Sequence, residues 1–166
     1  SGCTHTETLV LTINDSTSNS TIVTDCDAYT WSVNGTAYTA SGTYTDVSAN
    51  SSGCIHTENL VLTINNSTSN TTTLTQCESY TWPVNGSIYT LSGTYTDVST
   101  NASGCTHTDT LVLTINDSTS NSAIVTDCDT YSWPANGNTY TLSGTYIYVS
   151  TNASGCTHTE TLVLTI

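Results

Sequence analysis

Short runs of alternating apolar and polar residues, separated by turn residues, fill the chain and predict an all-β protein. The strands expected in the first full repeat are 21–24, 29–33, 36–39, 43–47 and 60–64. Residues 29–33, Tyr-Thr-Trp-Ser-Val, alternate aromatic and polar side chains, which is typical of a half-buried strand. Asn34-Gly35 follows, and because both residues tolerate positive φ, it favours a two-residue hairpin. No run is long or apolar enough to span a bilayer.

The whole pattern repeats without gaps every 51 residues. The repeats are 14–64, 65–115 and 116–166, and residues 1–13 match the end of a preceding repeat. We therefore expect residues 1–13 to be the last strand of that repeat, and the chain to be an excerpt from a longer tandem array. Residues 14–20 are the most polar stretch and are expected to be a connector between repeats.

Turn signals every 8–12 residues predict tandem small antiparallel β-sandwich modules of the Ig-like or Greek-key kind, with one disulfide each. The expected core of each module is one tryptophan, two or three tyrosines and the strand Leu-Val-Leu-Thr-Ile. A unit of this size buries barely enough apolar surface to offset its chain entropy. The disulfide is therefore expected to decide whether each module folds.

Seven cysteines at fixed spacing indicate an oxidising, extracellular environment. Pairing within a repeat gives Cys26–Cys54, Cys77–Cys105 and Cys128–Cys156, and leaves Cys3 for a preceding repeat. The other register gives Cys3–Cys26, Cys54–Cys77 and Cys105–Cys128, and leaves Cys156. Loop-closure entropy does not separate the two registers, since both give roughly 3.5 kcal/mol. We prefer the first, because the second links cysteines across the polar stretch 14–20.

The chain has no Lys or Arg, and its formal net charge is −13. Without cations it cannot neutralise nucleic-acid phosphates, and anionic membranes should repel it. No phosphate-binding loop is present and candidate catalytic groups occur only in repeated form, so we do not expect an enzyme.

Each Gly-Cys is followed by a histidine and, two residues later, by an acid. These pairs are His5 with Glu7, His56 with Glu58, His107 with Asp109, and His158 with Glu160. Positions two apart share one face of a strand. The pairs are expected to form structural hydrogen bonds; a metal site is the alternative, although two ligands do not complete a zinc site.

Acids also flank the first cysteine of a repeat, and clustered carboxylates suit calcium. The weak calcium candidates are Asp25, Asp27, Asp127 and Asp129, with Glu78, Asp46 and Asp97 as further acids. Position 25 becomes Gln76 and position 46 becomes Tyr148 in other repeats. We therefore expect no cofactor, with calcium as the exception to test.

A Tyr-x-Trp pair occurs in every repeat. The pairs are Tyr29 with Trp31, Tyr80 with Trp82, and Tyr131 with Trp133. Packing in the core is the preferred interpretation, because little else in the repeat is large enough to bury. The alternative is an exposed aromatic platform that stacks on sugars, which would make the protein a carbohydrate-binding adhesin. An ice-binding surface built from rows such as Thr43-Tyr-Thr45 is a further alternative, although the loops disfavour a regular threonine lattice.

Glycosylation candidates concentrate in the turns and connectors. The Asn-x-Ser/Thr sequons are at Asn14, Asn19, Asn34, Asn50, Asn65, Asn66, Asn70, Asn85, Asn101, Asn116 and Asn152. Short Asp-Ser/Thr matches to a bacterial O-glycosylation site fall at Ser16, Ser118 and Thr110.

The succession Cys-Asp/Glu-x-Tyr-x-Trp, Asn-Gly, Ser-Gly-Thr-Tyr, Gly-Cys-x-His-Thr and Leu-Val-Leu-Thr-Ile covers every repeat. It resembles the tandem repeats of very large Bacteroidota surface proteins, including SprB-type gliding adhesins. The resemblance implies an exported, cell-surface or extracellular filament, whose partners are neighbouring repeats, other copies of itself and surface glycans. We accordingly expect a disulfide-stapled, glycosylated structural segment of such a filament or adhesin.

Overall fold

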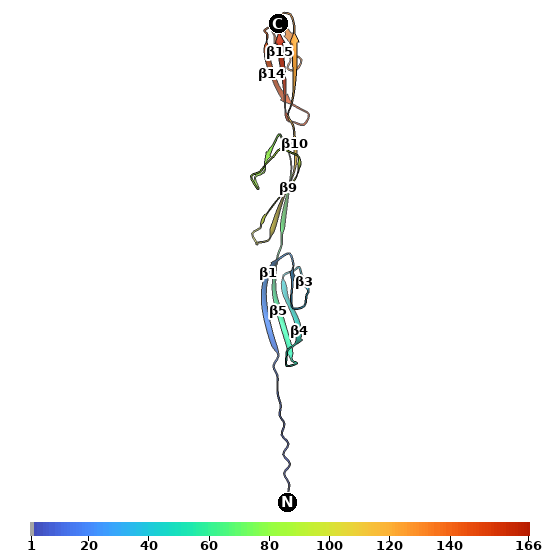
Figure 1. Ribbon diagram of the computed structural model, residues 1–166, viewed down its shortest axis with the longest axis vertical. Coiled ribbons are helices and arrows are strands. Elements are labelled where there is room, and N and C mark those ends of the chain that lie inside the picture. The colour runs from blue at the N-terminus through green and yellow to red at the C-terminus, as the bar shows by residue number, and fades with distance from the viewer. Residues whose placement is uncertain (1) are drawn as a thin grey trace. The chain divides into compact units, whose positions relative to one another are not determined.

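The computed structural model describes residues 2–166, and all of its regular structure is β (Figure 1). The first repeat contains β1 (Thr17–Cys26), β2 (Tyr29–Thr30), β3 (Ala37–Tyr38), β4 (Gly42–Ala49) and β5 (Ile55–Asn65). The second contains β6 (Thr68–Cys77), β7 (Tyr80–Thr81), β8 (Ile88–Tyr89), β9 (Gly93–Thr100) and β10 (Thr106–Asn116). The third contains β11 (Thr119–Thr126), β12 (Tyr131–Ser132), β13 (Thr139–Tyr140), β14 (Gly144–Thr151) and β15 (Thr157–Thr165).

Each repeat forms one three-stranded sheet, and in the first and third repeats the first and last strands are parallel. In the first repeat the order is β1-β5-β4, and the same order recurs as β6-β10-β9 and β11-β15-β14. β1 pairs with β5 in parallel from Thr17↔His56 to Cys26↔Asn65, whereas β4 pairs with β5 antiparallel. A parallel pair needs a long crossover, and residues 27–54 supply it.

The expectation of antiparallel β-sandwich modules is therefore wrong, although the all-β class is confirmed. A sandwich needs a second sheet, and here the inner face of each sheet is covered by a short two-stranded hairpin such as β2-β3. The chain is instead a repetitive all-β solenoid, in which each repeat contributes a sheet of the same topology.

The hydrophobic core of each repeat is small and lies between the sheet and the hairpin. Trp31, Leu60 and Leu62 are 3%, 0% and 2% exposed, and Tyr38 and Tyr44 pack against them. The leucines alternate along β5 with outward residues, so one face of the strand supplies the core. The tryptophan, tyrosines and Leu-Val-Leu-Thr-Ile strand were all expected in the core, and this prediction is confirmed.

Truncation of the central leucine should reveal how much stability this core provides. Leu111 is fully buried in β10 beside Trp82. Leu111→Ala should lower the free energy of unfolding by about 2–5 kcal/mol, because the surrounding side chains relax only partly into the cavity that it leaves. Val112 lies on the opposite face and is 37% exposed, so Val112→Ala is the matched control and should cost less. Urea unfolding of the oxidised protein measures both, and equal losses would contradict this description of the core.

The Asn-Gly turn closes a hairpin, as expected, but with a longer loop. Tyr29 pairs with Tyr38, and the N–H of Trp31 donates to the carbonyl of Thr36 (2.9 Å). Residues 32–35 therefore form a four-residue loop. The N–H of Gly35 donates to the Trp31 carbonyl (2.8 Å), and Gly35 has a positive φ of 71°, which glycine adopts without strain.

The polar stretch 14–20 is not simply a connector, because β1 already begins at Thr17. Its Ser, Thr and Asn side chains are exposed, and its backbone is paired with β5. A strand that lies at a sheet edge and pairs through its backbone does not need an apolar pattern, so polarity was a poor marker of a boundary in this chain.

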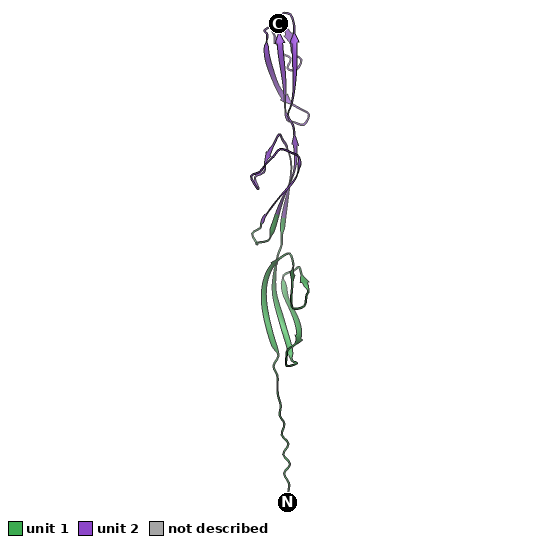
Figure 2. Ribbon diagram, viewed as in Figure 1, with its two compact units in different colours: residues 1–68, 100–107 green, residues 69–99, 108–166 purple. Residues whose placement is uncertain are grey.

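The described chain divides into two compact units (Figure 2). Unit 1, Ser1–Thr68 with Thr100–His107, holds the sheet β1-β5-β4. Unit 2, Ser69–Ser99 with Thr108–Ile166, holds the sheet β11-β15-β14 and most of β6-β10-β9. In both units, a segment from one repeat is combined with a segment from the next.

Residues 2–13 repeat the sequence of a core strand but form none. Leu9 is 84% exposed, whereas Leu60, at the same place in the next repeat, is fully buried. Leu60 is buried because β5 lies between β1 and β4, and residues 2–13 have no such neighbours in this structure. That residues 1–13 complete a preceding repeat stays a prediction, and Ser1 lies outside the described residues.

Candidate functional site

The chemically distinctive feature of the molecule is a pair of disulfides, and each of them joins two consecutive repeats. Cys26 bonds Cys105, and Cys77 bonds Cys156, each with a sequence separation of 79. The expected pairs Cys26–Cys54, Cys77–Cys105 and Cys128–Cys156 are therefore wrong, and so is the expectation of one disulfide inside each module. The alternative register is not found either, and Cys3, Cys54 and Cys128 are free thiols.

Parallel pairing explains why a bond cannot close within one repeat. Cys26 ends β1 and lies opposite Asn65, the last residue of β5. Cys54 immediately precedes β5, so it lies at the other end of the same sheet. Eleven residues of strand span about 36 Å, whereas the Cα atoms of a disulfide must come within about 7 Å.

We call the first of these regions joint 1, comprising Cys26, Asp27, Asn65, Ser67, Asn101, Ser103 and Cys105. The chain leaves β1 through Asp27, whose positive φ of 62° turns the backbone. The N–H of Asp27 donates to the Asn65 carbonyl (2.8 Å), and its carboxylate accepts from the N–H (2.8 Å) and hydroxyl (2.6 Å) of Ser67. The connector between the first two repeats is thus held by the residue that follows the disulfide.

On the other side of joint 1, Asn101 shapes the turn that presents Cys105. Its Oδ1 accepts from the N–H groups of Ser103 and Cys105, both at 3.0 Å, and its Nδ2 donates to the Asn66 carbonyl (2.9 Å). Cys105 is 1% exposed as a result. Hydrogen-bonded turns from two repeats therefore flank the cystine, in which Cys105 is buried and Cys26 is partly exposed.

Joint 2 repeats this arrangement in unit 2, with Cys77, Glu78, Asn116, Ser118, Asn152, Ser154 and Cys156. The N–H of Glu78 donates to Asn116 (2.9 Å), its carboxylate accepts from the N–H of Ser118, and Asn152 Oδ1 accepts from Cys156 (2.9 Å). Glutamate thus replaces aspartate at this position and keeps the positive φ, 66°.

The acids that follow the first cysteine have carboxyl pKa values below their ordinary range. The hydroxyl and N–H of Ser67 lower the pKa of Asp27, and the N–H and hydroxyl of Ser118 lower the pKa of Glu78. Both carboxylates face solvent, so these hydrogen bonds fix the position of the connector but add little to the free energy of unfolding.

The calcium candidates accept hydrogen bonds from backbone groups or are not grouped with other acids. Asp25 and Asp127 each accept the N–H of the following cysteine at 2.8 Å, and Asp27 holds Ser67. Asp129 repeats the positive φ of Asp27, at 63°. Within residues 2–166, no three histidine, cysteine or acidic side chains are grouped as a metal site would need.

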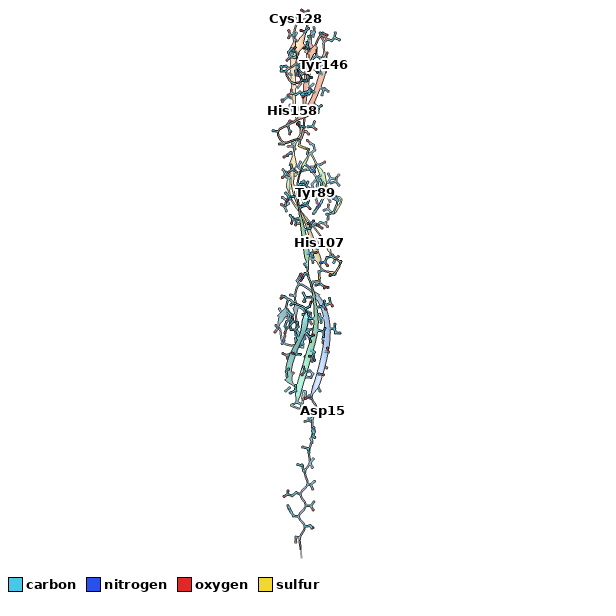
Figure 3. All side chains as sticks on the ribbon, turned by 180° about the vertical axis from the view of Figure 1, so that it is seen from behind. Asp15, Tyr89, His107, Cys128, Tyr146 and His158 are labelled. Carbon is cyan, nitrogen blue, oxygen red and sulfur yellow. A yellow bond between two sulfur atoms is a disulfide. The ribbon has the colours of Figure 1, made fainter. Side chains whose placement is uncertain are left out.

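A hydrogen-bond network links the parallel strands at the end opposite the cystine. Thr17 Oγ1 lies 2.6 Å from His56 Nδ1, His56 Nε2 lies 2.9 Å from Glu58 Oε1, and Asn19 donates to the same oxygen at 2.8 Å. The expected histidine–acid hydrogen bond is confirmed at His56 and at His158 with Glu160 (3.0 Å). Figure 3 shows His158 and Cys128 towards opposite ends of the β11–β15 pair. The exposed His5 and Glu7 are 3.5 Å apart.

Because of this network, the free energy of unfolding should fall at acidic pH. The bonds from His56 and Asn19 hold the pKa of Glu58 below its usual value, so ionised Glu58 stabilises the fold above the unfolded pKa of about 4.3. That contribution should disappear as the pH falls from about 4.3 through the lower folded pKa. Urea unfolding of wild type and Glu58→Gln from pH 7 to 3 measures it: the curves should converge in acid. Glu7→Gln is the exposed control, and curves that stay parallel would contradict the prediction.

The Tyr-x-Trp pairs do not form an exposed platform. Trp31, Trp82 and Trp133 are only 3–4% exposed, and the tyrosine of each pair is half-buried beside them. The core interpretation is confirmed, and sugar stacking on these tryptophans has no accessible ring face to use.

Most asparagines of the sequons have structural partners that sequence reasoning did not assign. Those whose side chains donate hydrogen bonds are Asn14, Asn19, Asn34, Asn50, Asn65, Asn70, Asn85, Asn101, Asn116 and Asn152. Asn66 is exposed in the connector, and its side chain has no such bond among the described residues. Ser16 and Ser118 are exposed, and Thr110 is half-buried in β10. The recurring Asn-x-Ser-Gly-Cys spacing was the signal for the turn role of Asn101.

The fold and joints define a class: a repetitive all-β protein whose successive repeats are covalently joined by disulfides. Those two disulfides indicate an oxidising, extracellular or secreted environment. No protein-family model matches the chain, and no curated protein matches it significantly. No helix able to cross a membrane occurs in residues 2–166.

Proposed function

We propose that this chain is a load-bearing structural segment of an extracellular or cell-surface filament, in which disulfides between repeats carry tension. The observation that carries the proposal is the connectivity of Cys26–Cys105 and Cys77–Cys156. Each disulfide is a covalent shortcut past more than one whole repeat, because its two cysteines are 79 residues apart in the sequence. The resemblance of the repeat to those of SprB-type surface proteins is a further reason for it.

The connectivity creates two covalent routes. One follows residues 3–26, crosses the Cys26–Cys105 bond and continues through 105–128. The other follows residues 54–77, crosses the Cys77–Cys156 bond and continues from Cys156. The first route contains β1, β10 and β11, and the second contains β5, β6 and β15. In each sheet, the first and last strands of the repeat thus belong to different routes.

Both routes meet in every sheet. β1 belongs to the first route and β5 to the second, and they are hydrogen-bonded neighbours along their whole length. Tension on either route is thus carried by backbone and disulfide bonds, and hydrogen bonds between parallel strands share it between the routes. The aromatic hairpin and β4 lie on residues 27–53, between the routes, and serve to cover the core.

This arrangement suits a filament outside the cell. Repeats with no Lys or Arg offer no site to trypsin-like proteases, and one cysteine of each cystine, Cys105 or Cys156, is buried. The edge strands are rich in threonine and serine, contain no Lys or Arg and carry at most one acid each, so they can also pair with further copies. The adhesin alternative, which relied on exposed Tyr-x-Trp pairs, has lost that basis because the tryptophans are buried.

Labelling of the native material tests the proposal. An antibody raised against the folded 166-residue chain should label filaments outside unbroken source cells, and treatment with a thiol reductant under flow should break or lengthen those filaments. A non-reducing thiol-free buffer under the same flow is the control. Label that appears only after permeabilisation, or filaments unaffected by reduction, would contradict the proposal.

A further inference from the structure

Each sheet has one face that the hairpin does not cover, and we call it the outer face. Its side chains alternate along the strands with the core residues. In the first sheet, the outward Val61 follows the buried Leu60, and Ile22 of β1 and Thr43 of β4 lie opposite Val61 on either side. The row is thus three strands wide. The same row recurs in the third sheet, as Ile124, Val163 and Thr145.

The aliphatic side chains of the outer faces are exposed to solvent. Ile22 is 79% exposed and Ile124, at the corresponding position of the third repeat, is 80% exposed. The valines that recur in β4, β9 and β14 are 60–67% exposed. The other outward positions of the first sheet hold threonine, serine and one asparagine. Each outer face therefore presents methyl and hydroxyl groups.

The charge of the chain lies on other surfaces. Positions two apart share one face of a strand, and every acid within a strand of residues 2–166 shares the face of the core residues. These acids are Asp25, Asp46, Glu58, Asp97, Asp109 and Glu160. All other acids lie outside the strands. Because the net charge is −13 and no Lys or Arg is present, the outer faces are where two copies can meet without like charges opposing each other.

We propose that the outer face of a sheet in one copy of this chain packs against the outer face of a sheet in a second copy, so that filaments associate side by side. Stacked sheets lie about 10 Å apart, and two identical faces form a self-complementary contact. The inference deepens the proposed function and rests on it, because it names the surface through which neighbouring copies meet. A cationic partner would find no acid on this face, and an anionic partner would be repelled by the rest of the chain.

The size of the outer face determines the strength of this contact. Three strands about 4.8 Å apart, each with about eight residues of roughly 3.3 Å, give a face of roughly 380 Å². A stable interface buries about 800 Å² on each partner. One face is therefore too small, whereas the three sheets together offer roughly 1,100 Å². Association of the 166-residue chain should accordingly be weak and reversible, and each added repeat should strengthen it.

The experiment uses the folded 166-residue chain with Cys3→Ser, Cys54→Ser and Cys128→Ser, which removes no bonded cysteine and leaves only non-covalent association. Sedimentation equilibrium should show a monomer that associates reversibly as its concentration rises. Added NaCl should strengthen the association, because salt screens the repulsion between the acids of the two copies. EDTA should leave it unchanged, because the outer face has no carboxylate that calcium could bridge.

A face variant, Ile22→Asp/Thr73→Asp/Ile124→Asp, places one acid on the outer face of each sheet. It should raise the Kd of self-association by more than about tenfold, because charges then enter an uncharged contact and repel their counterparts. All three positions lie on exposed parts of the first strands, so the fold should tolerate the change.

A turn variant provides the matched control. Ala40→Asp/Leu91→Asp/Leu142→Asp adds the same charge at exposed turn positions before β4, β9 and β14, outside the outer faces. Like the face variant, it removes two large aliphatic side chains and one smaller one. It should leave the Kd nearly unchanged, and the fluorescence of the buried tryptophans should be the same in both variants and the parent.

Opposite charges test whether the two faces meet each other. A mixture of the face variant with Ile22→Lys/Thr73→Lys/Ile124→Lys should associate more tightly than the parent, whereas a mixture of that lysine variant with the turn variant should not. Equal association in the two mixtures would overturn the inference.

Three further results would also overturn it: a parent that stays monomeric at every concentration, dissociation by EDTA, and equal Kd values for the face and turn variants. Thermal hysteresis of a monomeric parent that only the face variant loses would assign the outer face to ice instead. In each of these cases Cys26–Cys105 and Cys77–Cys156 remain closed, so the proposed function is unaffected. Absence of those two bonds, and not of self-association, would count against the proposed function.

Discussion

Removal of the Cys26–Cys105 bond should lower the free energy of unfolding by about 4.5 kcal/mol, the loop-closure value for this span in the chain-entropy model. The bond closes a loop with a sequence separation of 79, so the unfolded chain gains a large conformational freedom when it is broken. The double variant Cys26→Ser/Cys105→Ser makes the change without leaving an unpaired thiol. Urea unfolding, with Cys77–Cys156 intact, measures the loss.

The free cysteines provide the matched control for this variant. Cys54→Ser/Cys128→Ser also replaces two cysteines, but it removes no bond, so it should leave the stability of the monomer nearly unchanged. If the two double variants lost the same stability, or if Cys26→Ser/Cys105→Ser unfolded as the wild type does, the joint would not hold the repeats together.

Pulling the chain by its ends should show a much shorter contour length before reduction than after it. With both bonds closed, the shortest covalent route follows residues 1–26, 77–105 and 156–166. That is roughly 63 peptide units, or about 210 Å at roughly 3.4 Å each, against about 560 Å for the reduced chain.

Single-molecule force spectroscopy can distinguish this connectivity from bonds within repeats. Three bonds within repeats would leave roughly 81 peptide units on the shortest route, about 280 Å. A final length near 210 Å that increases to about 560 Å after addition of a reductant is expected. A length near 280 Å, or one that reduction does not change, would contradict the connectivity of the two disulfides.

The sequence predicted the local structure of a repeat well, because local features depend on local residues. The core of Trp31, Leu60 and Leu62 followed from aromatic and apolar alternation, and Gly35 followed from the turn that needs its φ. The direction of β1 could not be predicted in this way. A polar edge strand that pairs through its backbone carries no apolar pattern to show whether it runs parallel or antiparallel to β5.

The error in strand direction produced the error in the disulfides. Once β1 is parallel to β5, Cys26 and Cys54 lie at opposite ends of the sheet, and only the cysteine of the next repeat is within reach. Loop entropy depends on length alone and could not reveal this. The joint residues Asp27 and Asn101 could have been suspected from their fixed spacing to cysteine, but acids and sequons at these positions suggested calcium and glycan instead.

Disulfide mapping of the folded, unreduced protein tests the connectivity most directly. Because the chain has no Lys or Arg, cleavage on the amino side of aspartate is the suitable digest, and it places Cys26 on fragment 25–26 and Cys105 on fragment 97–108. Mass spectrometry should find these two fragments joined, and fragment 46–96 joined to fragment 129–166 through Cys77 and Cys156. Fragment 25–26 joined to 46–96 instead would mean that the bonds close within repeats, which would contradict both the joints and the load routes that depend on them.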